Sequence, residues 1–279
     1  MGIESKIRPV ASLPKVLSIL IYGRSGTGKT TIGSTFPKPL LFVDIQEKGT
    51  DSISNVEGVD VITVSTWAEL EEVYWYLGTG AGKEKYKSVV LDQVSSMQDF
   101  AMAHAMEEEG KDQMSQRLWG ITGGLMKTWL LNYRDLTDSG INVGFIAHDR
   151  ATKGEGSDED ETLDPSIGPR LMPSVAGLLN GAVKVIGNTY VREAFAMDDE
   201  KTRTIEYCMR LAPHPYYTTK MRNPMGTSIP EYIVDPSYDK LMQLLASGET
   251  KPVRRIVEEV KPAAETKVVK RTTTKSEEK

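Results

Sequence analysis

The sequence predicts an α/β protein whose central sheet is mostly parallel and flanked by helices. Short apolar runs begin near residues 16, 40, 88, 142 and 182, and stretches with helical periodicity separate them, an alternation typical of parallel sheets. A glycine-rich turn follows the first run, and the runs ending at Asp92 and His148 deliver polar side chains. Because ligands bind at the carboxyl ends of such strands, we expect a site where these features meet.

The glycine-rich turn joins an expected strand, Val16–Tyr22, to an expected helix. Its spacing, G-x-x-x-x-G-K-[ST], is that of a phosphate-binding loop, in which glycines let backbone N–H groups face the phosphates and the helix N-terminus favours their charge. We expect Lys29 to reach the β- and γ-phosphates and the Thr30 hydroxyl to bind Mg²⁺. The alternative is a plain glycine turn. The residues expected to hold the phosphates are Gly23, Arg24, Ser25, Gly26, Thr27, Gly28, Lys29, Thr30 and Thr31.

The next elements lead to a candidate metal ligand. Strands are expected at Leu40–Asp44 and Val59–Val64, and a capping box at residues 66–69 begins a helix. A second glycine-rich stretch, residues 78–83, follows that helix with different spacing and is interpreted as a loop. The apolar strand Ser88–Asp92 then ends in a carboxylate, as a Walker B strand does. We expect Asp92 to hold Mg²⁺, with a helix cap as the alternative.

The remaining chain continues the alternation and adds a hairpin. Two strands flanking residues 198–201 predict a β-hairpin, and a polar, acidic segment without periodicity precedes them. The expected elements are helices Met97–Glu109 and Leu118–Leu136, strand Asn142–His148, aperiodic segment Asp149–Pro169, helix Pro173–Leu179, strand Ala182–Ile186, hairpin strands Thr189–Met197 and Thr202–Leu211, and helix Tyr238–Ala246.

Composition and charge narrow the class of protein. With 39% hydrophobic and 26% charged residues, 279 residues suffice for one large α/β domain or two small ones. No apolar run spans a membrane and no secretion signal stands at the start, so a cytoplasmic location is expected. The single cysteine, Cys208, excludes an internal disulfide. From residue 251 onward, nine Lys or Arg oppose five Glu, so the net charge of −5 leaves about −9 for the body. This acidic body argues against a basic surface that coats nucleic acid.

In this order, the motifs resemble those of short phage-encoded RecA-like P-loop ATPases, nucleotide-binding proteins of the AAA family. Some members of that family act as single-strand annealing recombinases. The resemblance covers residues 16–247 as one ATPase domain, with residues 1–15 as a lead-in and residues 248–279 as a disordered charged tail. The residues that carry it are Gly23–Thr31, Leu40–Gly49, Val89–Asp92, Phe145–His148 and Thr219–Arg222.

The resemblance implies ATP and Mg²⁺ as cofactors and assigns roles to several residues. Glu47 would act as the general base, although Gln46 occupies the position that is usually acidic in RecA-like proteins. His148 would sense the γ-phosphate. Lys220 and Arg222 would reach the ATP of a neighbouring subunit, which implies a homo-oligomeric ring or filament.

The resemblance also implies action on single-stranded DNA in phage recombination or replication, with DNA-stimulated ATP hydrolysis. The segments expected near DNA are residues 109–117 and 149–170, with Arg150, Lys153 and Arg170 as candidate phosphate contacts. Two alternatives remain open at this stage. One is a P-loop kinase for a small molecule, and the other is a nucleotide-gated assembly factor without DNA activity.

Overall fold

In the computed structural model, the described residues form one central nine-stranded sheet. The structure describes the whole chain except residues 1–6, 8, 11–14, 153–165, 197–198 and 248–279. The strands lie in the order β11-β9-β8-β1-β5-β4-β2-β3, and β10 pairs with β8. Their bounds are β1 Ser18–Gly23, β2 Leu40–Ile45, β3 Val59–Val64, β4 Ser88–Asp92, β5 Asn142–Ala147, β8 Val185–Ala196, β9 Asp199–Arg210, β10 Lys220–Met221 and β11 Tyr232–Val234.

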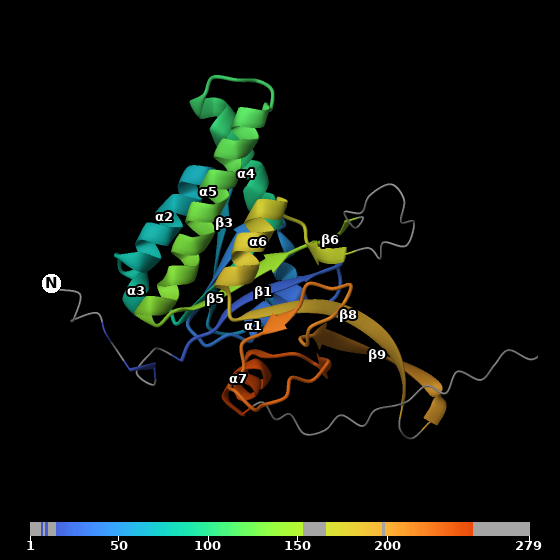
Figure 1. Ribbon diagram of the computed structural model, residues 1–279. Helices are drawn as coiled ribbons and strands as arrows, with labels where there is room; N and C mark the ends of the chain where they lie inside the picture. The colour runs from blue at the N-terminus through green and yellow to red at the C-terminus, as the bar shows by residue number, and fades with distance from the viewer. Residues whose placement is uncertain (1–6, 8, 11–14, 153–165, 197–198, 248–279) are drawn as a thin grey trace, which may run out of the picture.

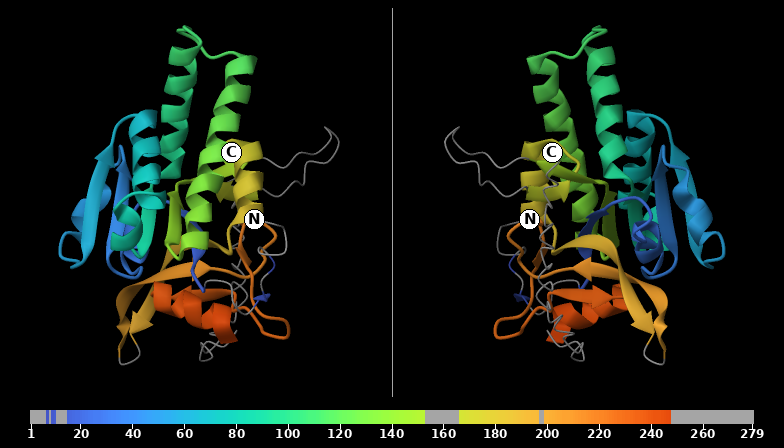
Figure 2. Two further views of the ribbon diagram at one scale, coloured as in Figure 1. Left: turned by 90° about the vertical axis from the view of Figure 1, so that its left-hand side faces the viewer. Right: turned by 90° about the vertical axis from the view of Figure 1, so that its right-hand side faces the viewer.

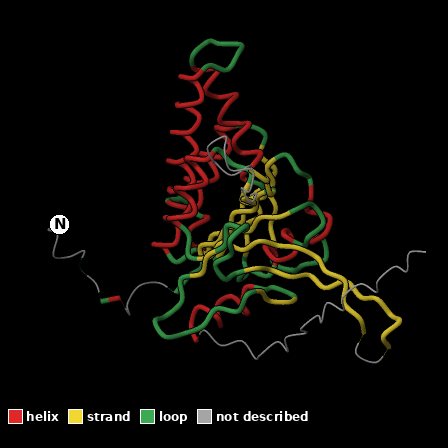
Figure 3. Tube along the Cα trace, turned by 45° about the vertical axis from the view of Figure 1, so that its right-hand side comes forward, coloured by secondary structure: helices red, strands yellow, loops and turns green. Residues whose placement is uncertain are grey.

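The strands from β8 to β3 run parallel, and the C-terminal strands are antiparallel. β9 pairs with β8 as a hairpin, and β11 pairs with β9 at the edge. Figure 3 shows this β8–β9 ribbon extending beyond the helices. The expected fold class, a RecA-like parallel sheet with helices on its faces and a C-terminal hairpin extension, is therefore confirmed.

Helices cover both faces of the sheet and create two apolar cores (Figure 1). One face carries α2, α4, α5 and α6, whose buried side chains include Leu70, Phe100 and Leu130. The other face carries α1 and α7, which contribute Ile32 and Leu241. In Figure 2, α4 and α5 form a pair that projects past the sheet. The helices are α1 Lys29–Ser34, α2 Trp67–Gly78, α3 Gly82–Lys85, α4 Val94–Glu108, α5 Gln116–Asp135, α6 Pro173–Ala182 and α7 Tyr238–Ser247, with short 3₁₀ turns η3 Gly49–Ile53 and η4 Leu136–Ser139.

Several predicted elements require correction. β8 is one continuous strand, whereas the sequence predicts two with a break near Gly187. A Cβ at Gly187 would lie 2.5 Å from Met209 Sδ, so the glycine makes room for the partner strand and does not end β8. The short helix α3 begins at Gly82, within the glycine-rich stretch that is expected as a loop, and ends at Lys85.

The aperiodic segment also has paired ends. Strands β6 (Asp149–Thr152) and β7 (Ser166–Pro169) form a separate two-stranded sheet, and the acidic centre of the segment lies outside the described residues. The Tyr22 hydroxyl donates to the Ile167 carbonyl at 3.1 Å, which ties β7 to β1. Within the described residues, no helix is long and apolar enough to cross a membrane.

Candidate functional site

The phosphate-binding loop joins β1 to α1 as the spacing predicts. Gly26 and Gly28 adopt left-handed backbone angles, φ 79° and 82°, which favour glycine. The Lys29 ammonium donates hydrogen bonds to the carbonyl oxygens of Gly23 (2.9 Å) and Arg24 (2.8 Å). Burial lowers the pKa of Lys29, and the nearby Asp92, Asp149 and Glu47 carboxylates oppose that shift. The Lys29 ammonium thus lies within the loop, at the place where the phosphates are expected to bind.

The phosphate-binding loop also contacts β8, the first strand of the hairpin. The hydroxyl groups of Thr27 and Thr189 lie 2.7 Å apart, and both are buried. The register places Gly23 beside Thr189, and a Cβ at Gly23 would lie 2.4 Å from Thr189 Oγ1. The end of β1 therefore needs glycine because the neighbouring strand approaches closely.

Thr30 and Asp92 meet although they stand on α1 and β4. The Thr30 hydroxyl donates to Asp92 Oδ2 at 2.7 Å. Burial raises the pKa of Asp92 to about 6, while the Thr30 hydrogen bond and the Lys29 charge oppose that rise. A hydroxyl and a carboxylate are hard oxygen ligands, which suit Mg²⁺. Within the described residues, no group of three His, Cys, Asp or Glu could hold a metal ion. The pair therefore fits Mg²⁺ that also keeps phosphate and water ligands.

Glu47, Gln93 and His148 gather beside this pair. Gln93 Nε2 donates to Glu47 Oε1, and His148 Nε2 lies 3.7 Å from the same oxygen. Gln46 has φ 68° and lies outside the set of residues that line the cavity, whereas Glu47 lines it. Burial and the Lys29 charge lower the pKa of His148, so its imidazole is neutral at pH 7. Gln93, which directly follows the strand-ending Asp92, was not predicted from the sequence.

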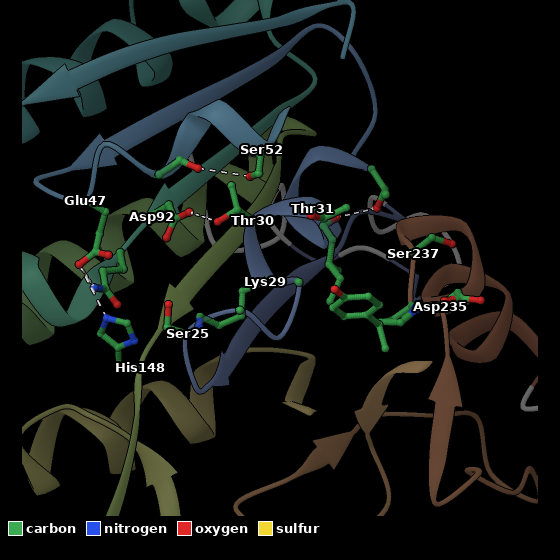
Figure 4. Close-up of a pocket in the computed structure, with 18 residues that line it drawn as sticks. Ser25, Lys29, Thr30, Thr31, Glu47, Ser52, Asp92, His148, Asp235 and Ser237 are labelled. Atoms are coloured by element: carbon green, nitrogen blue, oxygen red, sulfur yellow. Dashed lines mark hydrogen bonds and ion pairs between the residues drawn. The ribbon is translucent and has the colours of Figure 1, made fainter. Parts of the chain in front are cut away.

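These residues line one cavity of about 650 Å³ (Figure 4). Glu47, Asp92 and His148 lie toward one side of it, and Asp235 and Ser237 lie toward the other, with the start of α1 between them. The lining residues are Ser25, Gly26, Gly28, Lys29, Thr30, Thr31, Ile32, Thr35, Glu47, Gly49, Ser52, Asp92, Gln93, His148, Tyr207, Asp235, Pro236 and Ser237.

The second side of the cavity was not predicted. Tyr207 comes from β9, and Asp235, Pro236 and Ser237 come from the turn between β11 and α7. Long-range strand pairing brings this turn to the loop, since the Asp235 N–H donates to the Tyr207 carbonyl at 2.8 Å. Such pairing leaves no fixed spacing in the sequence, so no local motif points to these residues.

Lys220 and Arg222 lie away from this cavity. β10 pairs with β8 at Val185 and Ile186, near the amino end of β8, whereas the phosphate-binding loop lies beside Thr189. Their side chains donate to the carbonyl oxygens of Asn180 and Gly181. Neither residue lines the cavity of its own chain. Their action on a neighbouring subunit stays a prediction.

The two segments expected near DNA lie in different parts of the fold. Residues 109–117 connect α4 to α5 at the projecting tip, where Arg117 forms an ion pair with Glu109 at 2.9 Å. Arg150 and Arg170 are exposed beside β6 and β7, and the Arg170 N–H donates to the His148 carbonyl at 2.8 Å. Lys153 lies outside the described residues.

A family model covers most of the chain. A family model described as an AAA domain matches residues 15–223. No curated protein matches the chain.

Two of the solved structures that match the chain illustrate how weak the similarity is. One is a KaiC-like protein from the hyperthermophilic archaeon Pyrococcus horikoshii OT3, at 13% identity and a TM-score of 0.40 over 75% of this chain and 83% of that one. The other is the flagellar accessory protein FlaH from Methanocaldococcus jannaschii, at 12% identity and a TM-score of 0.40 over 81% and 87%.

Proposed function

This chain belongs to the AAA domain family, and from that premise we propose that it binds ATP with Mg²⁺ and hydrolyses it to ADP and phosphate. One observation carries the proposal: the phosphate-binding loop, the Thr30–Asp92 pair and Glu47 all line the same cavity. Phosphoryl transfer to water depends mainly on positioning and on neutralising charge, and these residues provide both.

Each residue has a definite task in this proposal. Lys29 exchanges its contacts with the Gly23 and Arg24 carbonyl oxygens for contacts with phosphate oxygens. Thr30 and Asp92 hold Mg²⁺, which neutralises phosphate charge when bound. Glu47 orients the attacking water and accepts its proton, and the hydrogen bond from Gln93 fixes the Glu47 carboxylate.

His148 is suited to report the state of the γ-phosphate. A neutral imidazole carries one N–H donor and one acceptor nitrogen, so it can donate to a phosphate oxygen. Its backbone is bound on both sides, because the His148 N–H donates to Ser95 Oγ at 3.2 Å and its carbonyl accepts from Arg170. Movement of His148 would therefore act directly on β6 and β7.

The test compares two lysines in glycine-rich stretches. Lys29→Ala should abolish Mg²⁺-dependent release of phosphate from ATP, since the phosphates lose their main cation. Lys83→Ala, an exposed lysine beside Gly82 on α3, should leave the rate unchanged. Equal rates for Lys29→Ala and the unmodified protein would refute the site assignment.

We further propose that the protein acts on single-stranded DNA as a homo-oligomer in phage recombination or replication. The hydrogen bond between the backbones of His148 and Arg170 supports the proposed action on DNA. It links the end of the cavity where the γ-phosphate would lie to a segment with two exposed arginines. Single-stranded DNA should then raise the ATPase rate, and Arg150→Ala with Arg170→Ala should reduce that stimulation while leaving the rate without DNA intact. Phosphate release that no DNA alters would favour an assembly factor, and transfer of phosphate to an added small molecule would favour a kinase.

A further inference from the structure

The side of the cavity opposite Glu47 is not used by the ATPase proposal above. It is formed by Tyr207 and by the turn at residues 235–237 (Figure 4). This turn lies beyond residues 15–223, to which the AAA domain model matches. The family match therefore includes Tyr207 but not the turn, so part of this wall lies outside it.

Tyr207 lies directly over the phosphate-binding loop. A Cβ at Gly28 would lie 3.2 Å from Tyr207 Cδ1, so the ring packs against the turn that opens α1. The side chain is nevertheless 44% exposed and lines the cavity. An exposed aromatic face next to a phosphate site is suited to stacking against a nucleobase.

The turn at residues 235–237 is held from both sides. The Asp235 N–H donates to the Tyr207 carbonyl at 2.8 Å, and the Tyr238 N–H donates to Thr35 Oγ1 on the far end of α1 at 2.8 Å. Lys240 Nζ donates to the Asp235 carbonyl at 2.8 Å. The wall is thus fixed relative to the loop before any ligand enters.

Asp235 has a strained backbone and a free carboxylate. Its φ of 47° lies in the left-handed region, which non-glycine residues adopt at a cost. Asp235 lines the cavity and is exposed, and among the described residues none forms a hydrogen bond or ion pair with its carboxylate. A carboxylate carried by this fixed turn can accept a hydrogen bond from an N–H or O–H donor on a ligand.

We propose that the nucleoside of the bound nucleotide lies between Tyr207 and the turn at residues 235–237. The Tyr207 ring stacks on the base, and the Asp235 carboxylate accepts a hydrogen bond from the base amino group or from a ribose hydroxyl. This assignment rests on the proposed binding of ATP and adds the site that selects the nucleoside.

The first test separates the nucleoside from the phosphates. Binding of ATP and of inorganic tripolyphosphate, both with Mg²⁺, is measured by calorimetry. Tyr207→Ala should weaken ATP binding about tenfold or more and leave tripolyphosphate binding unchanged, because only ATP carries a base to stack. Tyr207→Phe keeps the ring and should bind ATP normally. Tyr216→Ala, an exposed tyrosine outside the cavity, is the matched control and should change neither affinity.

The second test assigns the donor read by Asp235. The unmodified protein should bind ATP more tightly than either purine riboside triphosphate, which lacks the amino group, or dATP, which lacks the 2′-hydroxyl. Asp235→Ala should remove whichever of these preferences exists and keep tripolyphosphate binding. If Asp235→Ala binds one of the two analogues as tightly as it binds ATP, the group that this analogue lacks is the donor to Asp235.

The outcomes distinguish this inference from the proposed function. If Tyr207→Ala binds ATP as tightly as the unmodified protein, or loses ATP and tripolyphosphate equally, the nucleoside assignment is wrong and the ATPase proposal stands. A preference for ATP over both analogues that persists in Asp235→Ala would overturn the role of that carboxylate. If the unmodified protein binds neither ATP nor tripolyphosphate, the proposed function itself fails.

Discussion

At the scale of single residues, the site contains a carboxyl group, Asp92, whose burial raises the free energy of its charged form. Asp92 is only 8% exposed, and its pKa is raised to about 6 by burial. The folded protein therefore binds a proton at this carboxyl more tightly than the unfolded chain does. Its contribution to the free energy of unfolding is greatest at low pH and is lost as the pH rises through about 6, a change of about 3 kcal/mol. Above that pH the buried Asp92 carboxylate therefore destabilises the folded protein.

Asp92→Asn should therefore separate stability from activity. In protein free of nucleotide and Mg²⁺, the variant should melt several degrees higher than the unmodified protein at pH 8, because it removes a buried charge. The advantage should shrink as the pH falls from 8 to 5, since Asp92 becomes protonated. Calorimetric melting curves at both pH values test this, and an advantage that grows at low pH would contradict it. Mg²⁺-dependent hydrolysis should be lost.

At the scale of elements, α1 lies unusually close to the sheet. A Cβ at Gly33 would lie 3.1 Å from Phe42, 3.2 Å from Val90 and 3.3 Å from Ile146. The missing side chain lets the helix that opens with Lys29 rest directly on β2, β4 and β5. This close packing holds Thr30 within hydrogen-bond distance of Asp92.

Gly33→Val should push α1 away from the sheet and destabilise the protein by about 1–3 kcal/mol through overpacking. The matched control is Gly120→Ala on α5, where nothing lies within 4 Å of an added Cβ. That substitution should stabilise the protein by about 1 kcal/mol, because alanine favours helix more than glycine does. Urea denaturation measures both changes. A Gly33→Val protein as stable as the unmodified one would show that the helix–sheet contact tolerates extra volume.

Several residues that line the cavity can be predicted from short, local sequence patterns. The phosphate-binding loop follows from a fixed spacing, and Asp92 follows from an apolar run that ends in a carboxylate. Glu47 faces the cavity because β2 continues to Ile45, one residue further than expected, and Gln46 then turns the chain at φ 68°.

Tyr207 and Asp235, by contrast, could not be predicted from local sequence patterns. They reach the loop through antiparallel pairing of β9 with β8 and β11, and that pairing joins residues distant in the chain. The continuous β8 was missed because Gly187 resembles a strand break until the packing of Met209 is known.

At the scale of the whole molecule, the proposed assembly can be tested by mixing variants. An Arg222→Ala subunit retains its own Glu47 but lacks the arginine offered to a neighbour. A Glu47→Gln subunit has the opposite defect. If Arg222 acts across an interface, each variant alone should be nearly inactive and a mixture should regain part of the ATPase activity. Assembled mixtures that stay inactive would place Arg222 in a role within its own subunit, where it contacts the Gly181 carbonyl.

The charged C-terminal segment provides a second prediction at this scale. Residues 251–279 contain few large apolar side chains, so they have little surface to bury. Their deletion should leave the melting temperature almost unchanged. Differential scanning calorimetry tests this, and a fall of several degrees would mean that the segment packs against the domain.

The turn at residues 235–237 has a consequence for how relatives of this protein diverge. The turn contributes none of the residues proposed to bind phosphates, Mg²⁺ or the attacking water, so side chains there could change while those residues stay the same. Two proteins with the same phosphate chemistry could then prefer different bases or sugars. Nucleotide preference would be inherited separately from the capacity to cleave a phosphoanhydride.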